Sequence, residues 1–370
     1  MEGPREMEVP GQTEREAAAR LMPALVQAMA GWADASAKTT DPDATTADVD
    51  AGLSPYVANA IRRVREVVRE MASARQWAQD AGWALGDAIA AARRRAAVIR
   101  SVVYLGKVGS HSNRSAAAQY PQSELVPVIS FAEACACVID GRADAAVLPI
   151  DNSTAGTIGE VYDLLLRHDL HIVRGAALAI RNVLLGVPGA HLEDIREVWT
   201  HPQPIAQCAG FLRTHGLRAV AMESTAAAAD AVARRSDPAV AAIGSPEAAA
   251  LYGLHVLAEG IDDTAVNQTR FVTVMRQLHV PDDATRVTLV FTLPNESGSL
   301  ASVLARIADF GLNLVKIQSR PIPHRPWEYS FHCDFESPAD SRAALAALYL
   351  LDHELPWMKL LGWYPEGETV

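Results

Sequence analysis

Hydroxyl and amide side chains recur at points where a strand is expected to give way to a helix. The stretches are "GSHSNRSAAAQY" from Gly109, "PIDNSTAGT" from Pro149, "THPQPIAQC" from Thr200, "ESTAAAAD" from Glu223 and "GSPEAAA" from Gly244. In α/β folds such junctions meet at one edge of a sheet, and the free N–H groups of helix N-termini attract carboxylates. The junctions therefore predict a cleft lined with Ser, Thr, Asn and Gln that binds a small polyanion.

The stretch "DDTAVNQTRFVTV", residues 262–274, contains a second candidate for chemistry. Asn267-Gln268-Thr269 fits the N-glycosylation pattern, but a β-branched run follows at once and predicts a strand that starts near Thr269. On such a strand Thr269 and Phe271 share a face, and Arg270 points the opposite way. The Thr269 hydroxyl is therefore a candidate for chemistry. For Arg270, carboxylate binding and a structural ion pair both remain open.

The composition decides against the sugar. The start "MEGPREMEVPGQTERE" lacks the pattern of a signal peptide, and no run of about 18 apolar residues suggests a membrane span. Four scattered cysteines do not form a disulfide framework, so we expect a cytoplasmic protein with no membrane attachment. The net charge of −11 argues against nucleic-acid binding and leaves the capture of an anion to local donors.

The elements that must position these residues change in type along the chain. Residues 1–100 show helical periodicity almost without strand signal, whereas residues 101–278 alternate short β runs with helical stretches, which is typical of an α/β sheet. From residue 286 to 365 the order becomes β-α-β-β-α-β, the ferredoxin-like unit. These three ranges are the predicted domains.

Six segments between residues 104 and 271 resemble prephenate dehydratase, in the family's order and at family-like spacing. They read "YLGKVGSHSNRSAAAQY", "AAVLPIDNSTAGTIGEVYDLL", "THPQPIAQCAGFL", "ESTAAAA", "AAIGSPEAAALYGLHVL" and "NQTRF". The C-terminal "NESGSLASVLARIADFGLNLVKIQSRP" and "PWEYSFHCDFE" resemble the ACT regulatory domain. The resemblance implies two α/β lobes, like a periplasmic binding protein, with the active site between them. It implies a lyase of phenylalanine biosynthesis that converts prephenate to phenylpyruvate with loss of water and carbon dioxide. Positioning and electrostatics suffice for this reaction, so no cofactor or metal is expected.

The same resemblance implies individual site residues. The family's T-R-F threonine falls on Thr269, which we expect to hydrogen-bond the leaving hydroxyl. The asparagine of P-I-E-N falls on Asn152 and a glutamine on Gln207, while Thr200 keeps the hydroxyl of the serine before H-P-Q. The remaining expected substrate-binding residues are Ser112, Ser153, Thr154, Ser224, Thr225, Arg270 and Phe271.

Several motifs depart from the family pattern. The usual G-P-x-G-T-F-S turn reads "GKVGSHS", which places His111 where an aromatic residue is expected. The P-I-E-N motif has Asp151 for the glutamate, and H-C-L-L reads "NVLL" from Asn182. These departures leave open the fine substrate preference, including arogenate, the amino analogue of prephenate.

The ACT-like segment is expected to bind the effector phenylalanine between subunits of a homodimer or higher homo-oligomer. The family's G-A-L motif reads G-S-L here, and its E-S-R-P motif begins with Gln318. The expected phenylalanine-binding residues are Gly298, Ser299, Leu300, Ala301, Gln318 and Ser319. The alternative is a ferredoxin-like dimerisation unit without a ligand.

The N-terminal hundred residues resemble part of chorismate mutase. Arg15 and Glu16 match an R-E pair and Gln76 matches a glutamine near the end of the family's third helix, but the first helix with its cations has no counterpart. We expect a degenerate helical domain used for dimerisation. Two rival functions remain: a bifunctional chorismate mutase/prephenate dehydratase, and a non-catalytic two-lobed sensor of prephenate or phenylalanine.

Overall fold

The computed structural model describes residues 83–95, 98–264, 266–322, 325 and 327–367. Most of the predicted helical domain of residues 1–100, including the chorismate mutase-like motifs, lies outside these residues. Within the described part, the chain forms two compact units, one built mainly from residues 286–360 and the other mainly from residues 92–285. The second unit also contains the C-terminal residues from Leu361 onward.

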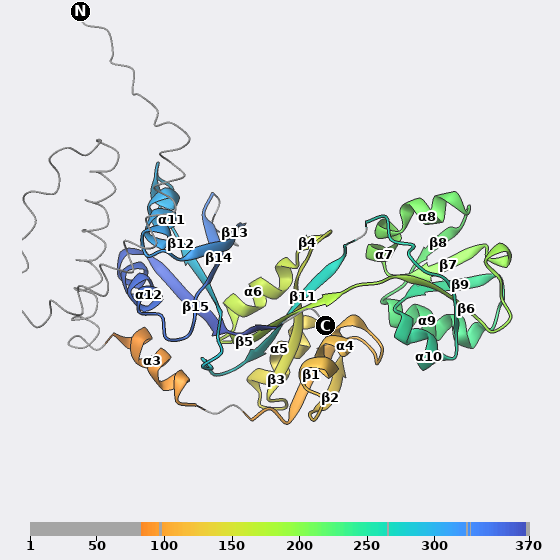
Figure 1. Cartoon of the computed structure of the whole chain (residues 1–370), viewed down its shortest axis with the longest axis horizontal. Helices are drawn as coiled ribbons and strands as arrows, with labels where there is room; N and C mark the ends of the chain where they lie inside the picture. The colour runs from red at the N-terminus through yellow and green to blue at the C-terminus, as the bar shows by residue number, and fades with distance from the viewer. Residues whose placement is uncertain (1–82, 96–97, 265, 323–324, 326, 368–370) are drawn as a thin grey trace, which may run out of the picture. The chain divides into compact units, whose positions relative to one another are not determined.

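The larger unit has two lobes, each built on its own sheet (Figure 1). The first lobe has a seven-stranded sheet in the order β16-β5-β11-β3-β1-β2, with β4 paired to β3. Strand β1 is parallel to β2 and β3, whereas β11 lies antiparallel between β3 and β5. The elements are β1 (Ser101–Leu105), α4 (His111–Gln119), β2 (Glu124–Val128), α5 (Phe131–Ile139), β3 (Ala145–Asn152), β4 (Gly156–Thr157), α6 (Gly159–Arg167), β5 (His171–Ala179), β11 (Gln268–Met275) and β16 (Glu366–Gly367).

The second lobe is inserted between β5 and β11, so two chain segments join the lobes. Its five-stranded sheet has the order β10-β6-β9-β7-β8. The core of this lobe consists mainly of aliphatic residues. The elements are β6 (Val183–Gly186), η1 (Leu192–Asp194), β7 (Glu197–Thr200), α7 (Pro202–Gln207), α8 (Ala209–Thr214), β8 (Arg218–Ala221), α9 (Thr225–Arg235), β9 (Val240–Gly244), α10 (Pro246–Tyr252) and β10 (His255–Ala258). The predicted two-lobed α/β fold is confirmed.

Helices α7 and α8 are separated at Cys208, which leaves helical geometry with φ −115° and ψ 21°. Asp263 fills the break. Its N–H donates to the Gln207 carbonyl at 2.7 Å, and its carboxylate accepts from the Gly210 N–H at 3.0 Å. Because both orphan backbone groups find a partner, the break costs little, and it ends α7 at Gln207.

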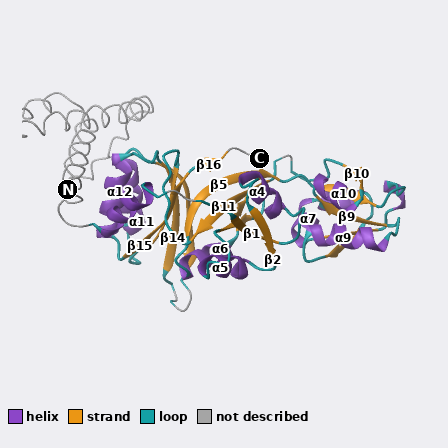
Figure 2. Cartoon of the chain, turned by 90° about the horizontal axis from the view of Figure 1, so that it is seen from below, coloured by secondary structure: helices purple, strands orange, loops and turns teal. Residues whose placement is uncertain are grey.

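The smaller unit has the order β-α-β-β-α-β, with a four-stranded sheet β13-β14-β12-β15. Helices α11 and α12 lie on one side of this sheet (Figure 2). Val303, Ile307 and Phe310 recur at helical spacing and are buried, which explains why α11 packs in this way. The elements are β12 (Arg286–Thr292), α11 (Ser299–Asp309), β13 (Asn313–Pro321), β14 (Tyr329–Glu336), α12 (Arg342–Glu354) and β15 (Trp357–Tyr364). The ferredoxin-like prediction is confirmed.

Candidate functional site

A cavity of about 480 Å³ lies between the two lobes of the larger unit. This volume suits a small-molecule ligand. Four of the five predicted strand-to-helix junctions contribute to its wall; the fifth, at Ser245, forms a helix cap and does not. Its polar lining residues are Lys107, Ser110, His111, Ser112, Asn152, His201, Gln203, Gln207, Glu223, Ser224, Thr225 and Thr269.

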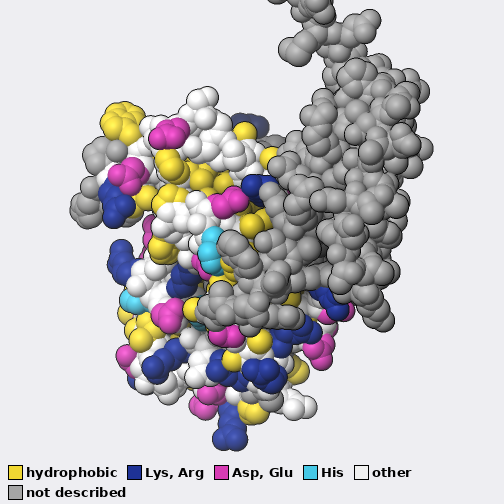
Figure 3. All heavy atoms as spheres, turned by 90° about the vertical axis from the view of Figure 1, so that its left-hand side faces the viewer, with side chains coloured by type: hydrophobic (Ala, Val, Ile, Leu, Met, Phe, Trp, Pro, Cys, Tyr) yellow, Lys and Arg dark blue, Asp and Glu magenta, His cyan; other side chains and the backbone are white. Residues whose placement is uncertain are grey.

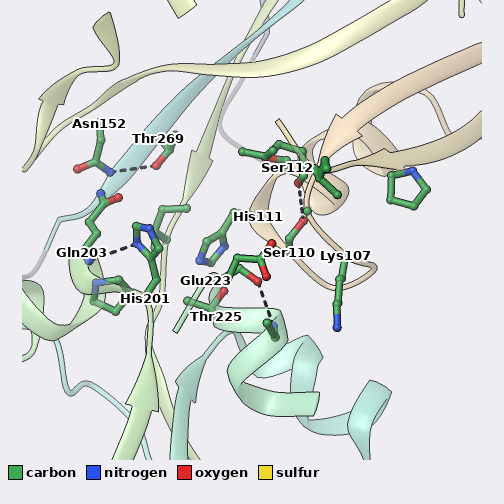
Figure 4. Close-up of a pocket in the computed structure, with 18 of the residues that line it drawn as sticks. Lys107, Ser110, His111, Ser112, Asn152, His201, Gln203, Glu223, Thr225 and Thr269 are labelled. Atoms are coloured by element: carbon green, nitrogen blue, oxygen red, sulfur yellow. Dashed lines mark hydrogen bonds between the residues drawn. The ribbon is translucent and has the colours of Figure 1, made fainter. Parts of the chain in front are cut away.

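Thr269 and Asn152 meet at one end of this cavity (Figure 4). They are register partners on the antiparallel strands β11 and β3, and Asn152 Nδ2 donates to Thr269 Oγ1 at 2.9 Å. The amide orientation is fixed because Asn152 Oδ1 accepts from the backbone N–H groups of Thr154 at 3.0 Å and Ala155 at 2.8 Å. Thr269 Oγ1 is thus an acceptor toward Asn152, and no acceptor among the described residues takes its hydrogen. That hydrogen is available to a ligand in the cavity.

Gln207 joins the same network from the second lobe. Its Nε2 donates to Thr154 Oγ1 at 2.8 Å, and Thr154 Oγ1 donates to Asn152 Oδ1 at 2.7 Å. The Gln207 Oε1 accepts from Asn182 Nδ2 at 3.4 Å. A directed chain therefore runs from Gln207 through Thr154 and Asn152 to Thr269, and each bond polarises the next.

Two helix N-termini face the cavity. Ser110 caps α4, where its Oγ accepts from the Asn113 N–H at 3.2 Å, and Ser224 caps α9, where its Oγ accepts from the Ala227 N–H at 3.0 Å. Ser112 and Thr225 belong to the first turns of these helices and also line the cavity. Helix dipoles and hydroxyl groups together make this wall favourable for a carboxylate.

Among the described residues that line the cavity, Lys107 is the only lysine or arginine and Glu223 is the only carboxylic acid. Burial, assisted by Arg114, lowers the pKa of His111 to about 4, and burial also lowers the pKa of His201. Both ring nitrogens of His111 are buried without a hydrogen-bond partner, whereas His201 Nδ1 accepts from the Gln203 N–H. His111 is therefore a neutral ring with one free donor and one free acceptor in the cavity wall.

Three expected site residues lie outside the lining. Thr200 is fully buried and its hydroxyl donates to the Ile243 carbonyl at 2.8 Å, so it ties β7 to β9. Arg270 pairs with Glu366, with Nε and Oε1 2.8 Å apart, and its Nη2 donates to the Tyr364 hydroxyl at 2.7 Å. Phe271 is packed in the core of the first lobe. In this structure the three side chains are engaged in a hydrogen bond between strands, an ion pair and core packing.

Two others, Ser153 and Thr154, lie in the turn after β3 and are exposed rather than part of the lining. Ser153 Oγ accepts from the Gln268 N–H at 2.9 Å and so holds this turn against the start of β11. Thr154 acts through the chain to Asn152. Both therefore position the residues that do line the cavity.

The structure adds Lys107, His201, Gln203 and Glu223 to the sequence-based candidates. His201, Gln203 and Glu223 lie within the junctions quoted above, so treating those junctions as continuous segments would have found them. Lys107 lies two residues before the first junction, in the loop that follows β1.

In the smaller unit, the expected effector residues occupy two elements. Gly298 precedes α11 with φ +89°, a left-handed conformation that favours glycine, and its helix has no side-chain cap. Ser299, Leu300 and Ala301 form the first turn of α11, and Gln318 lies with Ser319 on β13.

Within the described residues, no cluster of three His, Cys, Asp or Glu side chains has the arrangement of a metal site. In the same part of the chain, no helix is both long and apolar enough to span a bilayer.

Comparison of the sequence and the structure with known proteins shows which family this chain belongs to. The model for prephenate dehydratase matches residues 102–278 and the model for the ACT domain matches residues 287–349. The Arabidopsis thaliana protein named arogenate dehydratase/prephenate dehydratase 2, chloroplastic, is 38% identical over 280 residues, which are 73% of this chain and 74% of the relative. The crystal structure of prephenate dehydratase from Arthrobacter aurescens in complex with L-Phe aligns with a TM-score of 0.66 and 33% identity, over 72% of this chain and 90% of that one.

A further solved structure, of the quorum quenching acylase GqqA, aligns with a TM-score of 0.66 and 31% identity, over 72% of this chain and 98% of that one. Because an acylase shares this fold, the reaction has to be argued from side chains. The family itself follows from the extent of the sequence match to the Arabidopsis relative and from the two domain models in succession. This chain belongs to the prephenate dehydratase family.

Proposed function

We propose that this protein converts prephenate to phenylpyruvate in phenylalanine biosynthesis. Prephenate carries a carboxylate and a side chain on C1 of a non-aromatic ring, and a hydroxyl on C4. Breaking the C1–carboxylate bond sends its electron pair into the ring, the ring becomes aromatic, and the C4–O bond breaks. The dianion thereby yields phenylpyruvate, carbon dioxide and hydroxide, and one proton turns the hydroxide into water.

The main observation behind this proposal is that the hydroxyl hydrogen of Thr269 has no acceptor among the described residues. Asn152 donates to the Thr269 oxygen, so the hydroxyl hydrogen is free to bind the departing C4 oxygen. A threonine hydroxyl does not ionise near neutrality, so it stabilises the growing negative charge and relays a proton from solvent. A preorganised donor at the atom where charge develops is the most effective contribution that a protein can make to such a step.

The protein must also bind the two carboxylates of prephenate, at the other end of the substrate. The N-termini of α4 and α9, with the hydroxyls of Ser112, Ser224 and Thr225, supply donors on one wall of the cavity. Gln207 and Asn152 then act as polar anchors near the reacting hydroxyl. The cavity binds the substrate by local donors, as the net charge of −11 requires.

The direct test is the absorbance of phenylpyruvate formed from prephenate by the purified full chain, with and without phenylalanine. Turnover that phenylalanine changes supports both the reaction and the regulation. Absence of phenylpyruvate at any enzyme concentration overturns the proposed reaction and leaves the non-catalytic sensor as the better account.

One observation favours arogenate as a second substrate. The carboxylate of Glu223 lines the cavity, and arogenate carries an ammonium group where prephenate has a keto oxygen. We expect E223Q to lower kcat/KM for arogenate and to leave or raise that for prephenate, because the substitution removes a charge that attracts one and repels the other. Equal effects on both substrates would remove this candidate.

Regulation by phenylalanine is proposed to use the smaller unit. The uncapped N-terminus of α11 at Gly298 would receive the amino-acid carboxylate. Gln318 and Ser319 on β13, in the second motif of the family, would complete the site. Strand β13 is at the edge of its sheet and exposes Val315 and Ile317, each 38% accessible. This apolar edge supports a homodimer or higher oligomer formed through β13.

A cytoplasmic location is proposed for this protein. All four cysteines are free and buried, which supports a reducing, cytoplasmic compartment. On the face shown in Figure 3, basic and acidic side chains are interspersed, which supports a protein that does not bind nucleic acid.

We propose that the chain is divided into a helical domain (1–100), a dehydratase domain (101–278) and an ACT domain (286–365).

A further inference from the structure

Lys107 is the only lysine or arginine among the described residues that line the cavity. It lies in the loop between β1 and α4 of the first lobe, and its Nζ is 3.1 Å from Asp230 Oδ2 on α9 of the second lobe. The Lys107 side chain is 53% exposed and that of Asp230 is 18% exposed. A pair this accessible contributes little to stability, so Lys107 can leave it at small cost.

Asp230 does not depend on Lys107 for a partner. Arg234, one turn further along α9, donates from Nε to Asp230 Oδ1 at 2.9 Å. Both cations hold the pKa of the Asp230 carboxyl below its ordinary value, with the Arg234 hydrogen bond as the largest cause. When Lys107 moves away, Asp230 remains paired. Lys107 is therefore the exchangeable member of this group.

The position of Lys107 fits the shape of the substrate. In Figure 4 it lies on the opposite side of the cavity from Thr269 and Asn152. In prephenate the C4 hydroxyl and the C1 substituents are at opposite ends of the ring. A substrate with its hydroxyl at Thr269 thus directs its carboxylates toward the side where Lys107 lies.

On the basis of the proposed function, we propose that Lys107 is a substrate-binding residue. Its ammonium group leaves the ion pair with Asp230 and binds the side-chain carboxylate of prephenate. A cation on the ring carboxylate would stabilise the negative charge that has to leave as carbon dioxide, and this would oppose the reaction. A cation on the side-chain carboxylate has no such cost, because that group persists in phenylpyruvate. The contact is present in both the ground state and the transition state, so it acts on KM.

The test compares K107Q, K107R and D230N with wild type in the prephenate assay. We expect K107Q to raise KM about tenfold, in line with a hydrogen bond to a charged group, and to change kcat less than twofold. K107R keeps the charge and should restore most of the loss. D230N should leave KM unchanged or lower it, because it frees Lys107. R142Q, which removes an exposed cation paired with Asp140 at 3.3 Å, is the matched control for net charge.

Product inhibition identifies the carboxylate. Phenylpyruvate keeps only the side-chain carboxylate, so its inhibition constant should rise in K107Q by the same factor as KM. An unchanged KM in K107Q, or a D230N defect as large as that of K107Q, would overturn the proposal in favour of a plain inter-lobe ion pair. Unchanged inhibition by phenylpyruvate would overturn the assignment to the side chain. Wild-type enzyme without turnover would instead refute the proposed reaction, which is a separate result.

Discussion

Replacing Thr269 with valine removes one hydroxyl from the cavity and almost nothing else. Valine has the shape of threonine and the same preference for a strand, so β11 keeps its conformation. The two hydrogens of Asn152 Nδ2 are shared among three oxygens: Thr269 Oγ1 at 2.9 Å, Asn267 Oδ1 at 2.9 Å and the Gln268 carbonyl at 3.2 Å. In the variant both hydrogens retain an acceptor. We therefore expect the free energy of unfolding to change by no more than about 1 kcal/mol.

The effect on turnover should be far larger. The proposed role of the Thr269 hydroxyl is to donate to the departing oxygen, and loss of one such donor typically costs about 3–4 kcal/mol of transition-state stabilisation. This corresponds to a decrease in kcat of about 10² to 10³. Prephenate binding should change little, because the hydroxyl acts mainly where charge develops.

The assay is phenylpyruvate absorbance under saturating prephenate, with urea unfolding of each variant as the control for folding. T269S keeps the hydroxyl and loses only a methyl group, so it should retain turnover within about tenfold of wild type. A T269V enzyme with near wild-type kcat would refute the role of Thr269. T269S as inactive as T269V would show that packing, not the hydroxyl, matters.

Three further perturbations test neighbouring steps. T154V interrupts the hydrogen-bond chain from Gln207 to Asn152, so it should lower kcat about tenfold and change KM less than threefold in the same assay. T154S keeps the hydroxyl and should restore kcat. An equal loss of kcat in both variants would refute the role of this hydrogen-bond chain. R270M removes the part-buried ion pair with Glu366 and should lower the free energy of unfolding in urea by about 3 kcal/mol, with little change in KM. A large rise in KM would instead assign Arg270 to a substrate carboxylate. His111 has a pKa of about 4 in the folded protein against the ordinary 6.5, so the unfolded chain binds the proton first as pH falls. Relative to H111F, wild type should lose about 3 kcal/mol of stability between pH 6.5 and 4, and parallel pH profiles would contradict the burial of this ring.

The sequence predicts the fold where hydrophobic periodicity and residue propensity agree. All six elements of the ferredoxin-like unit follow the predicted order, because each has a long, clear pattern. Strand β5, "HIVRGAALA", was not predicted, since its central Gly175 and its alanines have low strand propensity and read as helical or loop. It is a strand because β11 pairs along its whole length, which is a tertiary contact. Strand β16 arises in the same way, from the pairing of Glu366 and Gly367 with β5.

The candidate site shows a similar division. Residue type and motif identify Thr269, Asn152 and Gln207, and the structure brings all three to one cavity. Residue type alone does not separate a hydroxyl that faces a ligand from one that ties strands together. Thr200 has the expected chemistry at the expected motif, yet its hydroxyl is used by the Ile243 carbonyl. Such a distinction depends on which strands are neighbours, and that is set by the packing of the whole lobe.

The direction of the Thr269 hydrogen depends on backbone N–H groups in the turn after β3, which residue type alone does not reveal. If the Asn152 amide were rotated by 180°, its oxygen would face Thr269 and would take the hydroxyl hydrogen for itself. The backbone N–H groups of Thr154 and Ala155 prevent this, since both need the oxygen on their side. The short turn after β3 therefore makes Thr269 a donor toward the cavity. Any substitution that changes the backbone of this turn should impair turnover even though the turn lies outside the cavity lining.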